Sequence, residues 1–168
     1  MNRTLADVAL DFAGSQVGVR EAGRNAGPKV EEYQQAVGLS PGDAWCAAFG
    51  SWCYLRASEE LGIGCPLVVS GGALRLWLRA PEEQRTQVPE SGAIGVIDHG
   101  GGHGHVFLVE HVDQGAPGNL VTIEGNTNDG GGREGDGVYR RVRRLPIPGL
   151  VGYVVPARSL GAIPRTEI

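Results

Sequence analysis

Cysteine is scarce in this chain, which excludes a disulfide scaffold. Cys46, Cys53 and Cys65 are the only three cysteines in 168 residues, so at least one stays unpaired. Cys46 and Cys53 would share one face of an expected helix, roughly 10 Å apart along its axis, too far for a bond. We therefore expect a protein made in the reducing cytoplasm.

Long hydrophobic runs are also missing. No apolar stretch approaches the roughly 20 residues needed to cross a bilayer, so we expect no membrane insertion. The first 18 residues mix charges with Leu5, Val8 and Phe12, a pattern typical of an amphipathic helix and not of a secretory signal. The expected protein has no signal peptide.

Positive charge is in short supply. Lys and Arg number 15 against 19 Asp and Glu, a net charge of -4, which argues against nucleic acid as a partner. One basic run, Arg-Arg-Val-Arg-Arg at 140–144, stands out. We interpret it as the exposed side of a strand, with a local binding patch as the alternative.

Glycine and proline are abundant, at 28 and 10 residues, and indicate short elements joined by many turns. A length of 168 residues with 41% hydrophobic residues suits one compact domain and is too short for two of ordinary size. We expect a single domain over residues 1–156, a C-terminal tail over 157–168, and a monomer.

Helical patterns come first along the chain and strand patterns second. Helices are predicted over 5–17, over 28–37 with Pro28 as first residue, from Cys46 to about Leu61, and from a cap at Ser70 to a stop before Pro81. Strands are predicted over 93–98, 105–113, 120–124, 138–142 and 150–155. The expected fold is α+β, with N-terminal helices packed on a C-terminal antiparallel sheet.

Cys46 is the first candidate for chemistry. The Ser40-Pro41-Gly42 breaker, Asp43 as a cap and the apolar run after Ala44 place this thiol at the start of a helix. Unpaired N–H groups there favour an anion, so the thiol would ionise more easily than free cysteine. The alternative is a small buried core residue.

His105 begins a predicted strand on which His105, Phe107, Val109 and His111 would share one face. A histidine beside a thiol can take its proton and later return it to a leaving group. Alternatively, His105 merely ends the glycine-rich loop that precedes it.

Glu124 and Asn126 lie where the next strand runs into a polar turn, and we expect them to share a face. Either could accept the ring N–H of the histidine and fix its tautomer, the third role in a nucleophile, base and orienter arrangement. Glu124 is the preferred orienter. Ordinary turn chemistry would also explain both residues.

Three segments resemble the signature blocks of the CHAP family, the cysteine, histidine-dependent amidohydrolases and peptidases. They begin at Trp45-Cys46, Gly104-His105 and Ile123-Glu124, in the family's order, and the resemblance extends from about Val17 to Val155. It implies a papain-like fold and cleavage of amide bonds in peptidoglycan, whose peptide or glycan-peptide would be the substrate. By the same resemblance Cys46 is nucleophile, His105 base and acid, Glu124 the orienter and Asn126 a further polar member.

The chain departs from the family in two respects. We expect no second, wall-binding domain of the kind that many members carry, because 168 residues leave no room for one. Some members hold calcium in an acidic N-terminal loop, but residues 21–25, Glu-Ala-Gly-Arg-Asn, lack the alternating carboxylates that such a loop needs. We expect no cofactor and no metal. Glu21, Asn25 and Tyr33 could line the cleft or could be surface or packing residues.

Rival interpretations stay open at this point. Zinc-type ligands are present, but their spacing does not match a zinc site. A module that binds peptidoglycan without cutting it, or a thiol hydrolase of small amides, would use the same cleft. An enzyme of this class without a signal peptide would reach the wall after release or delivery, either as a single-domain phage endolysin, our first expectation, or as an antibacterial secreted effector. The sequence leaves open whether an amidase or an endopeptidase bond is cut.

Overall fold

The computed structural model describes residues 3–128 and 135–156. Four helices come before the strands along the chain, and a short 3-10 helix, Glu82–Gln84, joins the two regions. The expected tail over 157–168 lies outside the described residues. The helices are α1 (Leu5–Ser15), α2 (Pro28–Gln35), α3 (Cys46–Leu61) and α4 (Ala73–Arg79), and the strands are β1 (Arg85–Thr86), β2 (Ile94–Gly100), β3 (His103–Val112), β4 (Asn119–Thr127), β5 (Gly137–Arg144) and β6 (Leu150–Val154).

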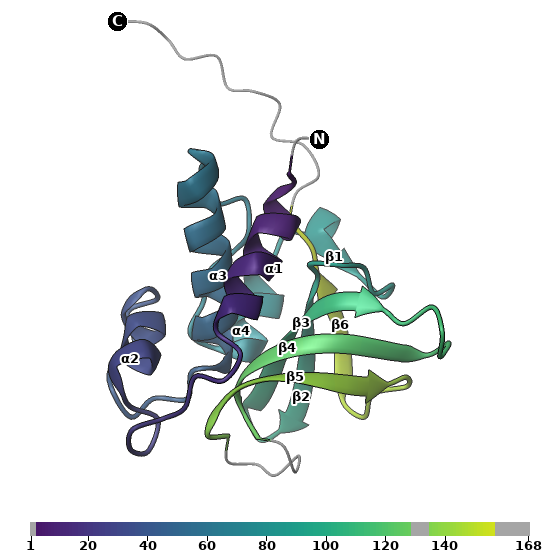
Figure 1. The fold of residues 1–168 in the computed structure, drawn as a ribbon. Helices are drawn as coiled ribbons and strands as arrows, with labels where there is room; N and C mark the ends of the chain where they lie inside the picture. Colours follow the sequence, from purple (N-terminus) through teal and green to yellow (C-terminus); the bar gives the residue numbers. More distant parts are fainter. Residues whose placement is uncertain (1–2, 129–134, 157–168) are drawn as a thin grey trace, which may run out of the picture.

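The helices form one layer and the strands a second (Figure 1). All six strands belong to one sheet in the order β1-β6-β2-β3-β4-β5, and every neighbouring pair is antiparallel. This confirms the α+β prediction. The short strand β1, which pairs with the end of β6, was not predicted.

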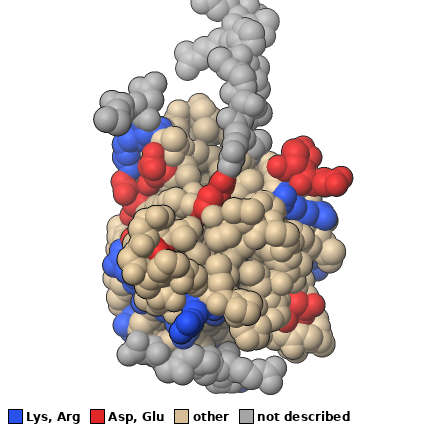
Figure 2. All heavy atoms as spheres, turned by 90° about the vertical axis from the view of Figure 1, so that its right-hand side faces the viewer, with Lys and Arg blue, Asp and Glu red and all other residues tan. Residues whose placement is uncertain are grey.

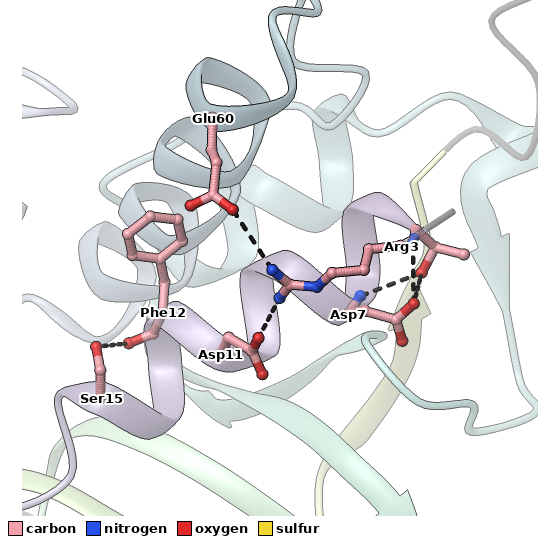
Figure 3. A network of polar contacts seen from close by, with 7 residues as sticks. Arg3, Asp7, Asp11, Phe12, Ser15 and Glu60 are labelled. Atoms are coloured by element: carbon pink, nitrogen blue, oxygen red, sulfur yellow. Dashed lines mark hydrogen bonds and ion pairs between the residues drawn. The ribbon is translucent and has the colours of Figure 1, made fainter. Parts of the chain in front are cut away.

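Helix α1 is fixed at its start by local polar chemistry. Thr4 accepts the Asp7 N–H while the Asp7 carboxylate accepts the Thr4 N–H, a reciprocal capping box. Arg3 forms ion pairs with Asp11 on the same helix and with Glu60 at the end of α3 (Figure 3). The polar side chains thus link α1 and α3 at the surface. Helix α1 ends at Ser15, two residues before the predicted boundary.

Two predicted helix caps are wrong. Trp45, not Asp43, is the N-cap of α3, and the Asp43 carboxylate instead accepts the Ser40 N–H in the preceding turn. Likewise Gly72 caps α4, while the Ser70 hydroxyl accepts the Gly72 N–H. In both cases the polar side chain satisfies a turn rather than the first turn of the helix.

The hydrophobic core lies on both faces of the sheet. On the helical side, Trp45, Phe49 and Trp52 of the α3 region meet Tyr33 of α2 in an aromatic cluster. On the other side, Phe107 and Tyr153 lie edge to face with ring centroids 6.3 Å apart. Because core residues pack against both faces of the sheet, its central strands are held in place and their ends can position a site.

A β-bulge in β3 changes one predicted alignment. Its register against β4 shifts between Val109 and His111, so Val112 joins Phe107 and Val109 in the second core cluster while His111 is exposed. The expectation that His111 shares a face with His105 is therefore wrong. The extra residue of a bulge reverses the alternation beyond it.

The sheet side of the surface carries both acidic and basic groups. Figure 2, which views the sheet side, shows acidic and basic groups around the margin of this face rather than a single basic field. In the part of the chain that the structure describes, no helix has the length and apolar character needed to span a bilayer.

Gly95 provides a test of packing in the second cluster. It is paired with Phe107 on one side and Tyr153 on the other, and a Cβ at this position would lie 2.1 Å from the Phe107 ring. We expect Gly95→Ala to lower the free energy of unfolding by about 1–3 kcal/mol through overpacking, measured by urea denaturation. Gly64→Ala is the control, since no atom lies near its Cβ position; equal stabilities of the two variants would contradict this packing.

Candidate active site

Cys46 is the first residue of α3 and is 7% exposed. The residue before it, Trp45, is fully buried and donates its indole N–H to Glu21 at 2.8 Å. A second oxygen of Glu21 accepts the Asn25 N–H. The carboxylate therefore fastens the start of α3 to the loop after α1, which limits movement of the thiol.

His105 lies near the start of β3, opposite Ile97 of β2. Its ring Nε2 is 2.8 Å from Oε2 of Glu124, and its side chain is 13% exposed. The other ring nitrogen, Nδ1, is not used by Glu124, and interaction with the imidazole lowers the pKa of the Cys46 thiol. Sulfur, imidazole and carboxylate thus form a continuous row.

Glu124 lies on β4 and its side chain is fully buried. Besides His105, it accepts a bidentate pair of hydrogen bonds from Arg143, both of 2.7 Å, and one from the Thr122 hydroxyl, also 2.7 Å. A buried carboxylate needs this kind of compensation. Its orientation is therefore set by three side chains at once.

The pKa values follow from these contacts. Burial opposes the charge of Glu124, but hydrogen bonds from His105 and Arg143 prevail and lower its pKa to about 2. Burial also opposes the charge of His105, yet Cys46 and Glu124 raise its pKa to about 9. At Cys46, burial raises the thiol pKa, but the hydrogen bond and charge of His105 reverse this and lower it. The site therefore favours a thiolate paired with an imidazolium.

Asn126 occupies a different position from Glu124. The register of β4 shifts between Glu124 and Thr127, and Asn126 takes a left-handed conformation with φ of 51°. Among the described residues, its side chain makes no hydrogen bond to Cys46 or His105. Of the two residues expected to share a face, Glu124 meets the histidine and Asn126 lines the cleft.

The row opens into a cleft of about 950 Å³. Cys46, His105 and Asn126 line it, and so do Glu21 and Asn25 from the loop before α2. Tyr33 does not line it, because it is fully buried in the aromatic cluster. The cleft is large enough for several residues of a peptide.

Sequence reasoning missed two arginines. The basic run alternates along β5, so that Arg140 and Arg144 are exposed, whereas Arg141 and Arg143 turn toward the cleft. The interpretation of the whole run as an exposed side is thus wrong for the second pair. The available signal was the alternation of side chains along the basic run, which puts Arg141 and Arg143 together on one face of the strand.

Among the remaining zinc-type ligands, His99 and His103 line the cleft with Cys46 and His105, whereas Cys53 and His111 do not. Cys53 is fully buried in the core, where burial raises its thiol pKa well above the ordinary value, and His111 is exposed beyond the bulge. Within residues 3–128 and 135–156, no group of three or more His, Cys, Asp or Glu side chains is arranged to hold a metal ion.

Comparison with known proteins identifies relatives of this arrangement. The CHAP domain matches residues 38–126, a span that contains Cys46, His105, Glu124 and Asn126. A solved structure described as "The crystal structure of Ly7917" superposes with a TM-score of 0.54 at 18% identity, covering 91% of this chain and 63% of that one. The chain thus spans less than two thirds of that protein, and the likeness shows the papain-like fold alone. No match was found among curated proteins.

The ion pair predicts the pH dependence of thiol reactivity. Because the pKa of Cys46 is lowered and that of His105 raised to about 9, alkylation of Cys46 by iodoacetamide should proceed already near neutral pH. In the His105→Gln variant, the increase of the alkylation rate with pH should begin at a higher pH, because the thiol loses its cationic partner. A Cys65→Ser background leaves Cys46 as the accessible thiol. Identical profiles with and without His105 would contradict the pairing.

Arg143 offers a test of the buried charge. Arg143→Met keeps much of the aliphatic stem but leaves Glu124 without its cation, which should cost about 3 kcal/mol of stability at neutral pH. The pKa of Glu124, about 2 against an ordinary 4.5, means that its stabilising effect is present above pH 4.5 and lost as pH falls toward 2. The variant should therefore also unfold at a higher pH on acidification.

Arg140→Met is the matched control. Arg140 lies on β5 like Arg143, but its side chain is exposed and pairs with Glu110 of β3. Surface pairs contribute about 0–1 kcal/mol. Urea unfolding at several pH values measures both variants. Equal losses of stability would show that Arg143 has no special role.

Proposed function

The chain belongs to the CHAP domain family, which matches more than half of its length, and we propose that it hydrolyses an amide bond of peptidoglycan. Family membership supports a hydrolase of the amidase or peptidase type. The observation that carries the proposal is the row of Cys46, His105 and buried Glu124 at the edge of a cleft.

In the proposed reaction, the Cys46 thiolate attacks the carbonyl carbon of the substrate amide. The sulfur–carbon bond forms and the carbonyl becomes an oxyanion, which the Cys46 backbone N–H at the start of α3 would stabilise. The His105 imidazolium then gives its proton to the leaving nitrogen as the carbon–nitrogen bond breaks. The product at this stage is a thioester between Cys46 and the acyl part of the substrate.

Hydrolysis of the thioester completes the cycle. Neutral His105 takes a proton from water, and the resulting hydroxide attacks the thioester carbonyl. The carboxylic acid leaves, and thiolate and imidazolium are restored. Throughout, Glu124 would hold the ring through Nε2 so that Nδ1 faces the sulfur. Asn126, at the cleft wall, is proposed as a polar contact for the substrate.

We propose the bacterial cell wall as the place of action, reached after release or delivery from the cytoplasm. A monomeric phage endolysin with one catalytic domain is the setting proposed first, and an antibacterial effector is the alternative. A neighbouring gene for a membrane pore would support the first, and one for an immunity protein the second.

The test of the proposed function uses purified peptidoglycan and mass spectrometry of the products. Wild-type protein should release fragments with new amine groups, and the cut bond identifies an amidase or an endopeptidase. Cys46→Ala should abolish release, since the nucleophile is gone, with a loss on the order of 10⁴-fold or more. Cys65→Ser, outside the cleft, should retain activity. Retention on peptidoglycan without products would instead indicate a binding module.

A further inference from the structure

Arg141 lies on β5 opposite Thr122 of β4, on the same face as Arg143. Its Nη1 donates to the Thr127 hydroxyl at 2.9 Å, so the side chain leans along the strand toward the end of the sheet. There it lines the same cleft as Cys46 and His105. The strand therefore delivers a guanidinium to the wall of the candidate site.

Arg141 differs from its neighbours on β5 in what balances its charge. Arg143 is paired with Glu124 and Arg140 with Glu110. Arg141 has the neutral Thr127 hydroxyl as its partner, and no carboxylate among the described residues lies within ion-pair distance of it. Its positive charge is thus directed at the cleft without a counterion in that part of the chain.

The acidic side chains of the cleft are engaged elsewhere. Glu21 accepts hydrogen bonds from Trp45 and Asn25. Asp136 accepts one of 2.6 Å from the Tyr139 hydroxyl. Both carboxylates thus have other partners, and neither forms an ion pair with Arg141 in the described part of the chain, so an anion that enters the cleft from solvent can pair with the guanidinium.

The contact with Thr127 also fixes which edge of Arg141 is available. Nη1 is used by the hydroxyl, which leaves the edge formed by Nε and Nη2, whose two parallel N–H groups match the two oxygens of a carboxylate. Thr127 directly follows Asn126 and stands close to Glu124 in the chain. Because Arg141 lines the same cleft as Cys46 and His105, a carboxylate on Arg141 would share that cleft with the reacting row.

We propose that Arg141 binds a free carboxylate of the substrate peptide, beside the amide that Cys46 attacks. This assignment rests on the proposed function and narrows it. The substrate class is a peptide amide with a carboxylate close to the scissile bond, in preference to the same peptide with a carboxamide. Arginine keeps its charge at every working pH, so recognition does not depend on the titration of this residue.

The binding test uses two synthetic muropeptides that differ in one group, a carboxylate or a carboxamide on the residue beside the scissile amide. Titration calorimetry with Cys46→Ala protein prevents turnover. We expect the carboxylate peptide to bind about tenfold or more tightly, the range of a charge-assisted hydrogen bond. Adding Arg141→Gln should remove this difference, and Arg141→Lys should restore part of it. Equal or undetectable binding of the two peptides would overturn the assignment.

Arg144→Gln is the control, because Arg144 lies on the same strand with its side chain exposed on the opposite face. It should preserve the preference for the carboxylate peptide. Loss of the preference in this variant would assign it to net charge rather than to Arg141.

Cleavage by protein with intact Cys46 separates this inference from the function on which it rests. Faster cleavage of the carboxylate peptide, with the preference lost in Arg141→Gln, supports both. Cleavage of both peptides with equal kcat/KM would uphold the hydrolase and overturn the role of Arg141. Discriminating binding without any cleavage would uphold the carboxylate site and overturn the hydrolase.

Discussion

The burial of one negative charge organises this protein. Glu124 has no exposed side-chain surface, and an isolated carboxylate in such a place would be far too costly to remain ionised. Four hydrogen bonds keep it charged: one from His105, one from Thr122 and two from Arg143. The same charge favours the imidazolium of His105, which in turn favours the thiolate of Cys46. The reactivity of the Cys46 sulfur therefore depends on Glu124, which acts on it through His105.

The layers of the fold divide this work between them. Helix α3 contributes the sulfur and the first N–H groups of a helix, while three neighbouring strands contribute imidazole, carboxylate and guanidinium in that order across the sheet. Because the core is packed on both faces of the sheet, the spacing of β3, β4 and β5 is fixed. The alignment of Cys46 with His105 and Glu124 then depends on the position of the start of α3. The hydrogen bond from Trp45 to Glu21 fixes that position.

Much of this could be predicted from the sequence, because it depends on local patterns. Apolar periodicity located the four helices and five of the six strands, and Pro28 marked a helix start as the rules predict. Bulges were not predictable, since the extra residue near His111 and that near Asn126 follow from pairing with a partner strand. Asp43 and Ser70 looked like caps but serve turns. The inward direction of Arg141 and Arg143 depended on knowing which face of β5 meets the cleft.

The order of the chain has a consequence for a protein being synthesised. Cys46 and α3 leave the ribosome early, whereas Arg143 belongs to a strand made much later and beyond the segment that matches the family. Until β5 pairs with β4, Glu124 lacks the two hydrogen bonds from Arg143 that orient it toward His105. The nascent polypeptide therefore carries the nucleophilic thiol before it carries the strand that completes the charge network around it, and chemical competence requires synthesis to proceed past β5.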